Sequence, residues 1–122
     1  MNKKLINAVA KQMGGMINLK DHAGDIYNYG AAGGVTGFNY FTETEAFAKK
    51  NHALIMELLS EFADDAGING LEILSGFNCF KHMTDSEIFD GLMNPKSEDR
   101  TTIYNGLAWF ALEEAARSFE NN

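Results

Sequence analysis

The chain has 122 residues, the usual size of one domain and too short for two separate cores. Seventeen acidic and ten basic side chains give a formal net charge of −7, which disfavours direct binding to nucleic acid or to anionic membranes. No apolar run approaches the roughly 20 residues that cross a bilayer. We therefore expect one acidic domain, residues 1–122, whose charge serves solubility or attracts a protein partner with a basic surface.

The cysteine content and the first residues of the chain indicate the cellular location. The single cysteine, Cys79, excludes an intramolecular disulfide. Asn7, Lys11 and Gln12 interrupt the apolar stretch that a signal peptide would need after the first lysines. The sequence therefore predicts a cytoplasmic protein.

Apolar residues three and four positions apart predict two helices in the first 29 residues. The first covers residues 3–13 and ends at Gly14 and Gly15. The second covers residues 18–29, with Asn18 as its N-cap. The residues predicted to face inward are Leu5, Ile6, Val9 and Met13 in the first helix, and Leu19, Ala23, Ile26 and Tyr27 in the second.

Residues 30–41 have an unusual composition, in which four glycines precede three aromatic residues. Glycine permits positive φ and close approach of the backbone to another surface. We expect a Gly/aromatic-rich loop here, with a short extended segment near 35–41. Its aromatic residues are Phe38, Tyr40 and Phe41.

The strongest helical pattern follows this loop. Thr42 and Glu45 have the spacing of a capping box, and Gly67 is suited to end a helix. The spacing predicts one continuous core helix between them. Its expected inward residues are Phe47, Leu54, Ile55, Leu58, Leu59, Phe62 and Ala66.

Three further helices are predicted in the remaining chain. The first runs from Asn69 to about Phe80, the second starts at a capping box of Thr84 and Glu87, and the last is capped by Ser97 and runs to about Phe119. The last has a wide apolar stripe that includes Trp109 and Leu112. The fold class is therefore all-α, a compact bundle of about five to six helices.

The sequence motifs typical of catalytic, metal-binding and phosphate-binding sites are weak in this chain. Cys79 and His82 are separated by two residues, but a zinc site needs four ligands, and His22 and His52 lie far away in sequence. Glycines 30–37 lack the lysine of a phosphate-binding loop. We therefore predict no catalytic residue, no metal site and no cofactor.

Acidic residues give the clearest candidate surface. Glu57, Glu61, Asp64 and Asp65 have helical spacing, which places Glu57, Glu61 and either Asp64 or Asp65 along one exposed edge of the predicted core helix. This edge is either an ordinary solvated helix face or a strip that binds arginines and lysines of a partner. With Phe38, Tyr40 and Phe41 it forms the predicted protein-binding site.

Three sequence segments resemble small phage and prophage proteins that have no assigned activity. These segments are Gly-Phe-Asn-Tyr-Phe-Thr-Glu-Thr-Glu-Ala-Phe at 37–47, Phe-Ala-Asp-Asp-Ala-Gly at 62–67 and Leu-Ala-Trp-Phe-Ala-Leu-Glu-Glu-Ala-Ala-Arg at 107–117. The likeness covers roughly residues 20–119, and it implies a protein of the bacterial host cytoplasm.

Small acidic phage proteins without enzymatic motifs are often inhibitors of host defence. The resemblance therefore implies an anti-CRISPR-like inhibitor that binds a Cas protein or effector complex and blocks its surface. The alternative is an antitoxin-like or virion-assembly module that acts as a homo-oligomer. In that case Trp109 and Leu112 would supply an apolar contact between copies.

Overall fold

The computed structural model describes residues 2–29, 41–77, 80–94 and 96–120. Over these ranges the chain forms seven helices and no strand, which confirms the predicted all-α class. The helices are α1 Lys3–Gln12, α2 Met16–Tyr29, α4 Thr44–Lys50, α5 His52–Ala66, α6 Gly70–Ser75, α7 Asp85–Met93 and α8 Arg100–Glu120. The extended segment expected near 35–41 lies outside the described residues, apart from Phe41.

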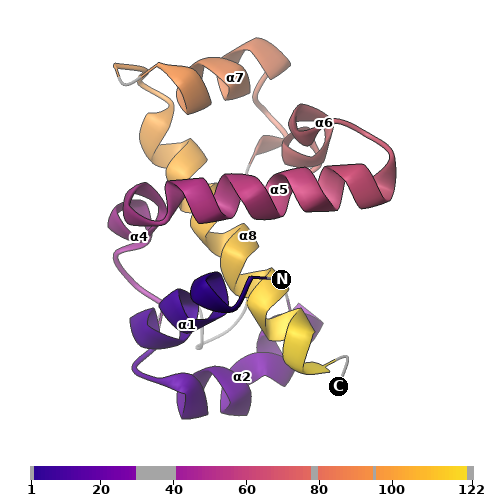
Figure 1. Cartoon of the computed structure of the whole chain (residues 1–122). Helices are drawn as coiled ribbons and strands as arrows, with labels where there is room; N and C mark the ends of the chain where they lie inside the picture. Colours follow the sequence, from indigo (N-terminus) through magenta and orange to yellow (C-terminus); the bar gives the residue numbers. More distant parts are fainter. Residues whose placement is uncertain (1, 30–40, 78–79, 95, 121–122) are drawn as a thin grey trace.

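Helix α8 is the centre of the fold. It runs diagonally through the molecule and contacts α1, α2, α4, α5 and α7 (Figure 1). Small residues allow these helices to approach it closely, since Gly106 and several alanines lie on its buried faces. Its fully buried residues include Ile103, Leu107, Ala108, Ala111, Leu112, Ala115 and Ala116.

Helices α1 and α2 pack against each other and against α8. Gly14 and Gly15 make the turn between them with φ of 92° and 133°, which other residues rarely adopt. The prediction of Asn18 as an N-cap is wrong, because α2 begins at Met16. The Asn18 amide instead donates a hydrogen bond to the Met13 carbonyl at 2.9 Å, across the turn.

The core helix predicted between residues 42 and 66 is divided in two. It breaks at Asn51, whose side-chain amide donates to the Phe47 carbonyl at 3.0 Å. This break accounts for the difference between the predicted five to six helices and the seven observed over the described residues. The inward stripe is largely confirmed, since Phe47, Ile55, Leu58 and Leu59 are buried, but Ala66 is exposed.

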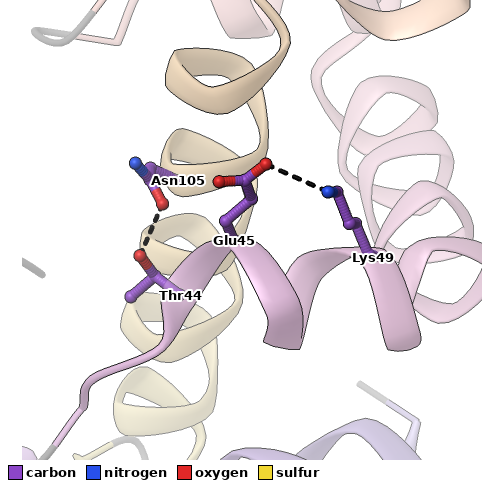
Figure 2. Close-up of polar contacts among 4 residues, drawn as sticks. All are labelled: Thr44, Glu45, Lys49 and Asn105. Carbon is purple, nitrogen blue, oxygen red and sulfur yellow. Dashed lines mark hydrogen bonds and ion pairs between the residues drawn. The ribbon is translucent and has the colours of Figure 1, made fainter. Parts of the chain in front are cut away.

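The capping box predicted at Thr42 is also wrong. Helix α4 starts at Thr44, and the residue before it, Glu43, has left-handed backbone angles and makes no side-chain cap bond. Contacts with other helices fix this position instead. The Thr42 carbonyl accepts a hydrogen bond from Gln12 of α1, and the Thr44 hydroxyl donates to Asn105 Oδ1 of α8 at 2.6 Å (Figure 2).

Local capping signals are more reliable in the next segment. The Thr84 and Glu87 box forms as predicted, with both reciprocal hydrogen bonds present at the start of α7. Asn69 caps α6, which is shorter than expected because it ends at Ser75. Ser97 accepts from the Asp99 amide at 3.2 Å, so it stabilises the turn before α8 and is not the helix N-cap.

Candidate protein-binding site

The four predicted acidic residues all lie on the exposed side of α5. Ile55, Leu58, Leu59 and Ala63 turn the opposite side of this helix into the core. We call Glu57, Glu61, Asp64 and Asp65 the acidic strip; each of them is exposed. Glu57 and Asp64 are separated by seven residues, so they point in nearly the same direction about 10 Å apart along the axis.

No positive charge neutralises the acidic strip within the described part of the chain. The two ion pairs found there are Lys49 with Glu45 at 3.1 Å and Arg117 with Glu114 at 3.4 Å, on α4 and α8. Residues 51–80 contain five acidic residues and no lysine or arginine. Like charges four residues apart on a helix destabilise it by roughly 0.2–0.5 kcal/mol per pair. The strip is therefore a surface of uncompensated negative charge.

A groove of about 510 Å³ borders the acidic strip, between the end of α5 and the start of α6. We call it the α5–α6 groove. Its lining residues are Met56, Leu59, Ser60, Ala63, Asp64, Gly67, Ile68, Asn69, Gly70 and Glu72. Asp64 belongs both to the strip and to the groove, so the two features are continuous.

The turn between α5 and α6 gives the groove its shape. Gly67 has φ of 71°, and the amides of Gly67 and Ile68 donate to the carbonyls of Asp64 and Ala63. This is a Schellman arrangement, which reverses the chain at the helix end. A Cβ at Gly70 would lie 3.3 Å from Leu59 Cδ2, so glycine lets α6 begin close to α5.

Among the three aromatic residues predicted for the site, the one that the structure describes is buried. Phe38 and Tyr40 lie outside the described residues. Phe41 is 1 % exposed, with its ring 5.1 Å from that of Phe47 and 5.3 Å from that of Trp109. Its ring therefore belongs to the core and is not available to a partner.

The apolar contact predicted between copies through Trp109 and Leu112 is wrong for Leu112. Leu112 is 0 % exposed, so it cannot meet a second chain without opening the fold. Trp109 is half-buried beside Phe41. The apolar residues that do reach the surface include Phe89 and Met93 of α7, which are 56 % and 66 % exposed.

A second hollow surrounds the start of α4, and four of its polar side chains are already paired with one another. Figure 2 shows Thr44 pointing to Asn105 and Glu45 pointing to Lys49, at the edge of this hollow. The hydroxyl of Thr44 and the amide oxygen of Asn105 satisfy each other between α4 and α8. This arrangement holds the two helices together, and we assign it a structural role.

The titratable groups include two carboxyl groups with shifted pKa. Burial raises the pKa of Glu114, partly opposed by the Arg117 guanidinium and reinforced by Glu113. Hydrogen bonds from the Thr84 amide and hydroxyl lower the pKa of Glu87 in the capping box. Both shifts have structural causes and lie outside the acidic strip.

A metal site would require histidines to lie together with other ligating side chains. Within the part of the chain that the structure describes, no three His, Cys, Asp or Glu side chains are grouped to hold a metal ion. Cys79 lies outside that part. The His52 ring contacts that of Tyr104 edge-on at 5.7 Å, and its buried Nε2 has no hydrogen-bond partner among described residues. None of the helices described here has the length and hydropathy to cross a membrane.

The family model described as "Domain of unknown function (DUF7222)" matches residues 3–122. The chain belongs to this family. Neither a curated protein nor a solved structure matches it. Because the match covers nearly the whole chain, the acidic strip and the α5–α6 groove both lie within the DUF7222 domain.

The sequence of this DUF7222 chain predicts the acidic strip but not the groove beside it. Two signals point to the groove. Ile68 is an isolated apolar residue in a turn between Gly67 and Asn69, and residues 51–80 contain no lysine or arginine. Neither signal reveals that Glu72 of α6 returns to the same surface as Asp64.

Proposed function

We propose that this chain acts by binding a protein with a basic surface in a fixed stoichiometry, through the acidic strip on α5. The observation that carries this proposal is the absence of any ion pair between the four exposed carboxylates and the described residues. Their mutual repulsion lowers helix stability. A partner that supplies arginines and lysines would relieve this repulsion and gain charge-assisted hydrogen bonds.

The resemblance to small phage proteins supports a more specific form of the proposal. In that form the chain inhibits a bacterial defence complex, as an anti-CRISPR-like protein that occupies a surface of a Cas effector. Surfaces that hold nucleic acid are basic, and an acidic strip is complementary to them. Expression of the chain should then raise phage plating on CRISPR-immune bacteria, whereas unchanged plating would refute this specific form.

Differential capture from a bacterial lysate tests the general form. The test variant carries Glu57→Gln and Glu61→Gln, and the matched control carries Asp21→Asn and Asp25→Asn on α2. Each pair is exposed, spaced by four residues and changes the net charge by the same amount. Wild type and the α2 control should retain a common basic protein that the α5 variant loses.

The salt dependence of the association rate is an independent test of the same interaction. Exposed charges are screened over about 8 Å at physiological ionic strength. The association rate of the captured protein should therefore fall steeply as salt rises, for wild type and the α2 control alike. If every captured protein is retained equally by both variants, the acidic strip is only a solvated helix face.

A second candidate function is that of a homo-oligomeric regulatory or assembly module. Phe89 and Met93 favour it, because they are four residues apart on α7 and both are largely exposed. Such a pair forms one apolar edge that a second copy could cover. Sedimentation of wild type and of a Phe89→Ser, Met93→Ser variant distinguishes the two candidate functions. A wild-type monomer would refute the homo-oligomeric module.

A further inference from the structure

The α5–α6 groove has two properties that an acidic helix face lacks. The first is an apolar lining, formed by the half-buried Met56 and by Ile68, which is 42 % exposed, above the buried Leu59. The second is a rim whose charged members, Asp64 and Glu72, are both acidic. A ligand for this groove therefore needs an apolar group and positive charge in close proximity.

The geometry extends this requirement along α5. Glu57 lies two helical turns before Asp64 on the same face, so negative charge continues for about 10 Å beyond the groove. No lysine or arginine lines the groove. A positively charged segment would therefore meet carboxylates both around the groove and along the strip.

We infer that the α5–α6 groove takes an apolar side chain from a protein segment whose neighbouring residues are arginines or lysines. The apolar side chain packs on Ile68 and Met56, and the flanking cations pair with Asp64, Glu72 and the acidic strip. This inference rests on the proposed function and adds to it the chemistry of the partner segment. Charge complementarity selects this occupant over an acidic or neutral segment.

If the groove is occupied, two kinds of contact contribute to the binding free energy. Charge pairs on the exposed strip mainly raise the association rate and are weakened by salt. An apolar side chain that leaves water for the groove mainly slows dissociation and is less sensitive to salt. The two contributions can therefore be separated experimentally.

Two labelled 12-residue peptides provide the probe. Both carry four arginines, and the first has two central leucines where the second has two serines. Fluorescence anisotropy should show that wild type binds the leucine peptide roughly tenfold more tightly than the serine peptide. Equal affinities, or no binding of the leucine peptide at millimolar protein, would overturn the inference.

Ile68→Ser is the test variant, and Ile17→Ser is its matched control. Ile17 is 76 % exposed on α2, so the control removes an exposed isoleucine elsewhere on the surface. Ile68→Ser should abolish the preference for the leucine peptide, whereas Ile17→Ser should retain it. A retained preference in Ile68→Ser would overturn the inference.

A measurement on wild type removes any dependence on the folding of the variant. Backbone amide spectra titrated with the leucine peptide should show the largest shifts at Ile68, Asn69 and Gly70. Shifts centred on another helix would overturn the inference, as would sedimentation of a wild-type dimer that Ile68→Ser dissociates, because a second copy would then fill the groove.

Failure of the groove inference is distinguishable from failure of the proposed function. If the acidic strip binds a partner without the groove, Glu57→Gln with Glu61→Gln weakens capture while Ile68→Ser leaves it unchanged. If the proposed function itself fails, neither variant changes the capture of any protein.

Discussion

Gly106 of α8 is the position where a single methyl group should test the packing of the fold. A Cβ there would lie 2.3 Å from Cζ of Phe80 and 2.9 Å from its Cε1. Carbon atoms in contact are about 3.5–4.0 Å apart, so the ring would have to move by roughly 1 Å or more. Phe80 is 0 % exposed and its ring stacks on Phe77 at 5.8 Å, which leaves little room for that movement.

Two opposing terms set the size of the effect of Gly106→Ala. Replacing glycine by alanine in a helix interior gains about 1 kcal/mol. Overpacking of a core costs about 1–3 kcal/mol, and a separation of 2.3 Å favours the upper part of that range. We expect a net loss of about 1–2 kcal/mol of unfolding free energy, which corresponds to a fall in Tm of about 4–8 °C.

Urea and thermal unfolding followed by circular dichroism measure this loss, and a double-mutant cycle assigns its cause. In a Phe80→Leu background the smaller side chain leaves space, so Gly106→Ala should there be neutral or stabilising by up to about 1 kcal/mol. A clash between residue 106 and Phe80 is excluded as the cause if Gly106→Ala stabilises the wild-type chain, or if its effect is the same in both backgrounds.

Three further substitutions test local features of the fold. Thr84→Ala removes the side-chain part of the α7 capping box and should cost about 1 kcal/mol in urea unfolding. Alanine keeps the backbone amide, which is the first cause of the lowered Glu87 pKa, and loses only the contribution of the hydroxyl, so only a part of this cost should disappear as pH falls below 4.5. His52→Phe removes the unpartnered Nε2 and keeps an aromatic ring against Tyr104, so unfolding free energy should be unchanged or higher by up to about 1 kcal/mol; a clear loss would mean that Nε2 has a stabilising partner. Burial raises the pKa of Glu114, so its ionised form opposes folding at neutral pH, and Glu114→Gln should be more stable than wild type at pH 7. That advantage should disappear as pH falls through the raised folded-state pKa towards 4.5, and a constant difference across this range would contradict the argument.

Local signals in the sequence predicted those elements whose ends are fixed by neighbouring residues. Thr84 with Glu87 formed a capping box because both partners lie within one turn. Gly67 ended α5 because its positive φ is a local requirement. The inward side of α5 followed equally well from the spacing of its apolar residues.

The signals failed where a contact from a distant helix decides the outcome. Thr42 has the same cap spacing, but Gln12 and Asn105 hold this turn from α1 and α8 and move the helix start to Thr44. The same limit applies to the candidate site. Helical spacing predicted the exposed acidic strip, whereas the burial of Phe41 and the approach of Glu72 to Asp64 depend on how the helices pack.

We propose that α5 and the start of α6 form the surface that binds a partner. The most direct measurement is a set of amide spectra of the labelled chain with and without the protein captured from lysate. Signals of residues 57–72 should broaden or shift, while those of α2 should remain in place. Changes confined to α2 or to α7, with residues 57–72 unaffected, would contradict the claim.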